Sequence, residues 1–87
     1  MTIKTLKTQL EQDFLCHHKE MERNQELALE EKKKGSTLRS DYLDNIVTKE
    51  ATICCYICEV LSAINDTSSD SEMERLYDKF KLWKGEE

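Results

Sequence analysis

The sequence contains no proline and only two glycines among its 87 residues, and its aromatic content is 7%. Sandwiches and barrels use proline and glycine at their many turns, and collagen-like chains need glycine at every third position, so the scarcity of both residues argues against these classes. Charged residues make up 36% of the chain, with 13 basic and 18 acidic side chains. This composition predicts an all-α protein, and the length allows a single small helical domain over residues 1–87.

An excess of positive charge is also absent, because the formal net charge is −5. Binding to nucleic acid or to an anionic membrane needs a basic surface, so we expect neither partner. The longest apolar-leaning run, residues 51–64, contains Thr52, Glu59 and Ser62 and is too short to span a bilayer. Four cysteines without a signal-peptide pattern suit reduced thiols, so we expect a cytoplasmic protein.

Residues 3–34 follow one helical period. Seven residues recur at steps of three, four or seven and fall within an arc of about 80°, a narrow seam of the coiled-coil kind. They are Ile3, Leu6, Leu10, Phe14, His17, Met21 and Ala28. The three lysines at 32–34 suit the negative end of a helix dipole, and Gly35 suits the left-handed position that closes a helix. The pattern predicts a helix over 3–34.

Two further helices are predicted after a short polar connector. Over residues 40–65 the apolar side chains spread over an arc of about 160°, roughly twice the width of the first seam. Residues 67–71 form a polar break with two possible capping boxes, and a short helix with an aromatic face follows over 71–84. The predicted fold is an antiparallel helical hairpin of two long helices plus a short C-terminal helix.

A connector centred near residue 36 or 37 predicts which positions of the two long helices lie level. His17 is then expected beside Cys55 or Cys58, and Met21 beside Ile53 or Cys54. The predicted core consists of Leu10, Phe14, Met21, Ile46, Ile53, Ile57, Val60 and Ile64.

The cysteines and histidines are the candidate residues for a metal or catalytic site. Only His17, Cys54 and Cys58 can converge from regular helices, whereas zinc takes four such ligands. Cysteines on an apolar helix face are more often small core residues, and mid-helix thiols lack the exposed, electropositive setting of a nucleophile. No glycine-rich phosphate loop is present. We therefore expect no catalytic residue, no metal and no cofactor.

The broad apolar face of the second predicted helix exceeds what one narrow seam covers, which indicates binding through helices. The candidate protein-binding residues lie on one flank of this helix and on the face of the third. They are Val47, Ala51, Cys54, Cys58, Leu76, Tyr77, Phe80 and Trp83. The third helix either covers that flank or joins it in contacting another protein or a second copy in a dimer.

Three segments resemble the small helical-hairpin co-chaperones of type III secretion needle subunits: TQLE at 8–11, ELALEEKKK at 26–34 and DY at 41–42. The resemblance covers roughly residues 3–65. It implies a cytoplasmic, non-enzymatic hairpin that pairs with a larger helical-repeat chaperone and keeps a needle subunit from polymerising early. The alternative is a phage-encoded small inhibitor that binds and blocks a host protein such as a nuclease or polymerase.

Overall fold

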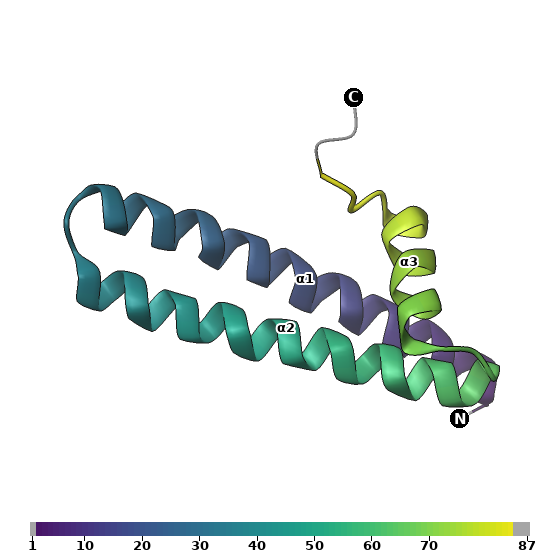
Figure 1. Cartoon of the computed structure of the whole chain (residues 1–87). Coiled ribbons are helices and arrows are strands. Elements are labelled where there is room, and N and C mark those ends of the chain that lie inside the picture. The colour runs from purple at the N-terminus through teal and green to yellow at the C-terminus, as the bar shows by residue number, and fades with distance from the viewer. Residues whose placement is uncertain (1, 85–87) are drawn as a thin grey trace.

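The computed structural model describes residues 2–84. It contains three α-helices, α1 (Ile3–Lys33), α2 (Thr37–Asn65) and α3 (Ser69–Phe80), and this part of the chain has no strand. α1 and α2 lie side by side, and α2 returns along α1 from the connector (Figure 1). α3 lies at the end of this pair away from the connector and is steeply inclined to both long helices (Figure 1). The predicted all-helical fold is confirmed.

The end of α1 has the geometry that the sequence predicts. Gly35 has a φ of 85°, in the left-handed region that glycine adopts without steric cost. Its N–H donates to the Lys32 carbonyl at 3.1 Å, and the Ser36 N–H donates to the Glu31 carbonyl at 2.9 Å. These two bonds form a Schellman motif, which satisfies carbonyls that the helix itself leaves free.

α2 and α3 end with the same motif but without glycine. Asp66 and Lys81 take φ values of 55° and 56°, a conformation that disfavours side chains with a Cβ by about 1–2 kcal/mol. In each case the following N–H returns to the carbonyl five residues back, at 2.9 and 2.8 Å. The left-handed turn at Lys81 ends α3 at Phe80, four residues before the predicted end.

Both later helices begin earlier than predicted, α2 at Thr37 instead of 40 and α3 at Ser69 instead of 71. The cap of α3 is Ser68, whose Oγ accepts a hydrogen bond from the Ser71 N–H at 3.1 Å. In a capping box that starts at Ser69, the Glu72 side chain would bond back to the first residue of the helix. In the structure it turns inward instead and is buried.

The core lies where α3 crosses the two long helices. Its buried members are Phe14, Cys54, Ile57, Cys58, Leu61 and Leu76, with Leu10, Met73, Tyr77, Phe80 and Leu82 packed around them. Of the predicted core residues, Phe14 and Ile57 are buried and five others are half-buried. The prediction for Ile53 is wrong, because this side chain is 37% exposed. α2 is rotated so that Cys54, the next residue in sequence, and Cys58, one turn further on, point inward instead.

The predicted register between α1 and α2 is also wrong. Nδ1 of His17 lies 2.5 Å from Oε2 of Glu50, and the Cys54 thiol donates to the Phe14 carbonyl at 3.8 Å. His17 therefore lies more than one turn from the position predicted for it, beside Cys55 or Cys58. The early start of α2 accounts for part of this shift, since it moves the centre of the turn to about Gly35.

Candidate protein-binding site

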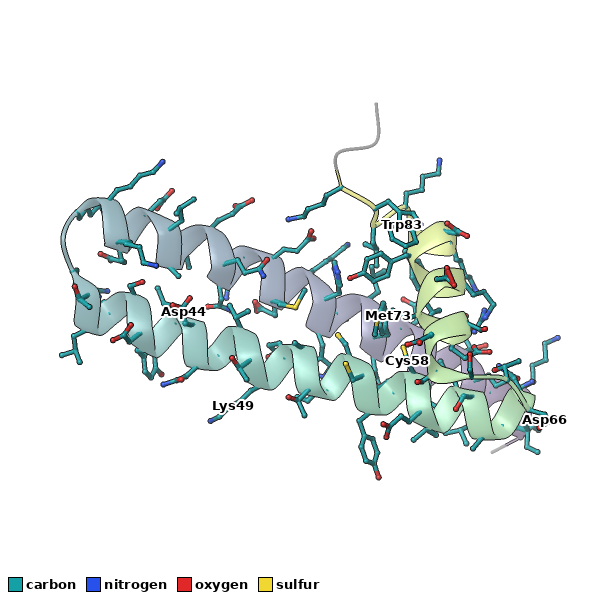
Figure 2. The ribbon with its side chains drawn as sticks, in the orientation of Figure 1. Asp44, Lys49, Cys58, Asp66, Met73 and Trp83 are labelled. Carbon is teal, nitrogen blue, oxygen red and sulfur yellow. The ribbon has the colours of Figure 1, made fainter. Side chains whose placement is uncertain are left out.

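The structure places the sequence-predicted binding residues mainly beneath α3. Cys54, Cys58 and Leu76 are buried, and Val47, Ala51, Tyr77 and Phe80 are half-buried, whereas Trp83 is 48% exposed. Met73 of α3 packs against the cluster that contains Cys58, and Figure 2 labels both residues beside α3. Of the two arrangements that the sequence left open, α3 packs on the hairpin. In this conformation α3 covers the flank at Cys54 and Cys58, so another protein can contact that flank only if α3 moves away from it.

The four thiols fall into two groups. Burial raises the pKa of Cys54 to about 12 and that of Cys58 to about 11, so both remain protonated at neutral pH. Cys16 and Cys55 are exposed. Within residues 2–84, no group of three or more His, Cys, Asp or Glu side chains is arranged to hold a metal ion.

α3 is fastened to α1 by charged side chains. Glu11 of α1 receives Nη2 of Arg75 at 2.9 Å and Nζ of Lys79 at 2.5 Å. Burial alone would raise the pKa of Glu11, but hydrogen bonds from Lys79 and Arg75 hold it below its usual range. The two cations, one helical turn apart on α3, therefore grip the same carboxylate.

A buried carboxylate organises the junction between α2 and α3. Glu72 is only 2% exposed. Its Oε1 accepts from Asn65 at 3.2 Å and from Arg75 at 2.8 and 3.1 Å, and its Oε2 accepts from the Thr67 hydroxyl at 2.6 Å. Burial alone would raise the pKa of Glu72, but the bonds from Thr67 and Arg75 lower it. The Glu72 side chain thus joins the end of α2, the segment 66–68 between α2 and α3, and α3 itself.

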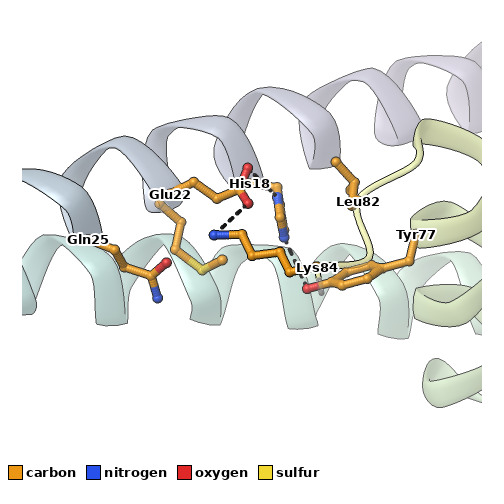
Figure 3. A pocket seen from close by; sticks show the side chains of 7 residues that line it. His18, Glu22, Gln25, Tyr77, Leu82 and Lys84 are labelled. Carbon is orange, nitrogen blue, oxygen red and sulfur yellow. Dashed lines mark hydrogen bonds and ion pairs between the residues drawn. The ribbon is translucent and has the colours of Figure 1, made fainter. Parts of the chain in front are cut away.

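A pocket of about 270 Å³ lies between α1 and the segment after α3 (Figure 3). His18 is buried there, and a hydrogen bond of 3.0 Å joins its Nε2 to the Tyr77 hydroxyl. Its Nδ1 lies 3.6 Å from Glu22 Oε1 and has no hydrogen-bond partner in residues 2–84. Nζ of Lys84 lies 3.0 Å from the other oxygen of Glu22.

The order carboxylate, imidazole, hydroxyl is that of a catalytic triad, but the electrostatics of this pocket differ. Burial raises the pKa of Tyr77, which makes its hydroxyl a poor nucleophile. Burial also lowers the pKa of His18, although Glu22 acts in the opposite direction. Lys84 pairs with Glu22, and His18 is joined to Tyr77. These two contacts hold α3 and the segment that follows it against α1.

On the far side of α2 lies an open, mainly apolar face that was not predicted from the sequence. We call it the outer stripe, and it consists of the apolar residues Leu38, Tyr42, Ile53 and Tyr56 together with Lys49; exposed Asn45 lies on its edge. Leu38 is 84% exposed, and Tyr42 and Tyr56 are each 66% exposed. At 100° per residue the five positions fall within about 60° of one another. Leu38 and Tyr42 also line a surface hollow of about 440 Å³.

The outer stripe lies opposite the face that packs on α1 and α3. Cys54 and Cys58 are on average about 150° away from it around the helix, at 100° per residue. Figure 2 shows Lys49 on the edge of α2 that points away from α1. The spacing 38, 42, 49, 53, 56 was the available signal, because it repeats every three, four or seven residues along 19 residues of α2.

Comparison with protein families, with curated proteins and with solved structures finds no match to this chain. None of the helices within residues 2–84 is both long and apolar enough to cross a membrane.

Proposed function

We propose that this chain is a non-enzymatic protein-binding module, an antiparallel hairpin of α1 and α2 that docks another protein on the outer stripe of α2. The observation that carries the proposal is the exposure of Leu38, Tyr42 and Tyr56 along one line of a helix. Single exposed apolar residues are ordinary, whereas an aligned set on one helix face is typical of an interaction site. Tyrosine is also among the residues that contribute most to interface energies.

Within this class, the resemblance over residues 3–65 favours a cytoplasmic co-chaperone that pairs with a larger helical chaperone and a secretion needle subunit. A small inhibitor of a host nuclease or polymerase is the alternative, and it would use the same stripe for steric blocking. The two versions differ in the identity of the protein bound, which the following experiment reports.

The test compares two faces of α2 by quantitative affinity purification from the organism that encodes the chain. Tyr56→Glu places a carboxylate on the outer stripe, and Ala51→Asp places one on the half-buried flank that the sequence favoured. Desolvating an unpaired carboxylate opposes binding, so Tyr56→Glu should reduce recovery of the specific partner at least tenfold. Glu26→Gln, on the exposed surface of α1, serves as the control and should leave recovery unchanged.

Loss of the partner with Ala51→Asp but not with Tyr56→Glu would show that the partner binds the flank of α2 near α3 and not the outer stripe. Retention of the partner by both folded variants would contradict binding through α2. Circular dichroism of each variant shows whether it remains helical.

A further inference from the structure

The charges on and beside the outer stripe have a definite order along α2. Lys49 lies near the middle of the stripe, with apolar residues on both sides of it along the helix. Asp41 and Glu59 are exposed and lie about 80° from Lys49 on one flank. Because they are 18 residues apart, they share one angular position and are separated by about 27 Å along the axis.

An antiparallel pair of two copies brings like charges together. When two stripes are centred on each other near residue 50, the two Lys49 side chains lie on either side of the twofold axis, offset by about 3 Å along the helix direction. A twofold axis perpendicular to the helices places identical flanks on the same side of the contact. Asp41 of one copy then lies level with Glu59 of the other, so carboxylates oppose carboxylates at both ends.

A parallel pair of two copies has the same defect at its centre. Equal positions then face each other, so Lys49 meets Lys49 in the middle of an apolar contact. Like charges placed against each other in an interface cost free energy and are a common means of excluding a partner. Both symmetric arrangements therefore place Lys49 against Lys49 near the centre of the contact. Arg39, on the other flank, is the one group of α2 that a parallel pair would bring to Asp41, but it lies 3.6 Å from Glu31 of its own chain.

We infer that the outer stripe takes a helix of a different protein with the opposite charge order. This inference rests on the proposed function and specifies the partner. The docking helix presents apolar residues at helical spacing, a carboxylate at its centre opposite Lys49, and Lys or Arg on the flank that meets Asp41 and Glu59. Such a helix satisfies each charged group while the apolar side chains cover Leu38, Tyr42 and Tyr56.

The test is a selection with a phage-displayed library of amphipathic helices on the full-length protein. The library keeps an apolar face of constant sequence and varies one central and two flanking positions among Glu, Gln and Lys. We expect Glu at the centre to be enriched about tenfold over Lys, with Lys enriched at the flank. The variant Lys49→Glu should reverse the central preference and leave the flank preference unchanged. Lys19→Glu, on the exposed face of α1, is the matched control and should behave as the unmodified protein.

Helices enriched without any charge preference would overturn the inferred partner while leaving docking on the stripe intact. Failure to enrich any helix over a Tyr56→Glu counter-selection would also overturn it. The proposed function is judged separately, by the comparison of the two α2 faces in partner recovery. Sedimentation as a dimer that Tyr56→Glu dissociates would assign the stripe to a second copy instead.

Discussion

Replacing Glu72 with alanine should strongly destabilise the protein, because this carboxylate joins three parts of the chain. The change leaves the hydrogen-bond donors of Asn65, Thr67 and Arg75 without their common acceptor. Removing one partner of a buried ion pair typically costs about 3–5 kcal/mol. Arg75 is partly exposed and keeps its contact with Glu11, which reduces the penalty. We therefore expect Glu72→Ala to lower the free energy of unfolding by about 2–4 kcal/mol.

That loss is a large share of the stability available to the domain. A chain of this size is expected to have about 4–13 kcal/mol in total, and each kcal/mol corresponds to about 4–8 °C in Tm. Urea unfolding followed by circular dichroism measures the difference directly. Glu74→Ala, on the exposed side of the same helix, is the control and should stay within about 0.5 kcal/mol of the unmodified protein.

The same carboxylate predicts an acid dependence with a definite sign. The pKa of Glu72 is lower in the folded protein than its ordinary value of 4.5. Its contribution to stability is therefore complete above about pH 4.5 and is lost as the pH falls through the folded pKa. Glu72→Gln should flatten this dependence, although Glu11, whose pKa is also lowered, retains part of it. A Glu72→Ala protein as stable as the Glu74→Ala control would show that the buried Glu72 carboxylate does not stabilise the junction of α2 and α3.

Three further predictions concern the core, the thiols and a helix end. Phe14→Ala should cost about 3–5 kcal/mol of unfolding free energy, since the side chain is fully buried; a loss below 1 kcal/mol in urea would contradict the packing. Alkylation of the native protein should modify Cys16 and Cys55 rapidly and the two buried thiols only after unfolding, as mass spectrometry can show. Lys81→Gly should raise stability by about 0.5–1 kcal/mol, because glycine adopts the left-handed turn without strain; an unchanged or lower Tm would argue against that turn.

The helices themselves could be predicted from the sequence because their signals are local. The period of residues 3–34 and the lysines before Gly35 define α1 to within one residue of its observed end. The start of α3 and its end at Phe80 were harder to predict from the sequence. Several serines compete as caps, and nothing local marks Lys81 for a left-handed conformation.

The rotation of α2 could not be predicted from its own sequence. Its apolar arc is broad enough that either edge could face α1, and contacts from other elements decide between them. The pairing of His17 with Glu50 and the arrival of α3 over Cys58 turn one edge inward. The opposite edge, with Tyr42 and Tyr56, is left open. The breadth of the apolar face predicted that part of it would stay uncovered, but which edge of α2 remains exposed depends on the tertiary structure.

Site-specific photo-crosslinking in the native cell shows whether another protein lies against the outer stripe of α2. A benzophenone side chain at position 56 lies on the outer stripe, and one at the exposed position 12 of α1 serves as the control. We expect a discrete adduct with one protein from position 56, absent from position 12 and lost when Tyr42→Glu is added. No adduct from position 56, or equal adducts from both positions, would contradict binding through the outer stripe of α2.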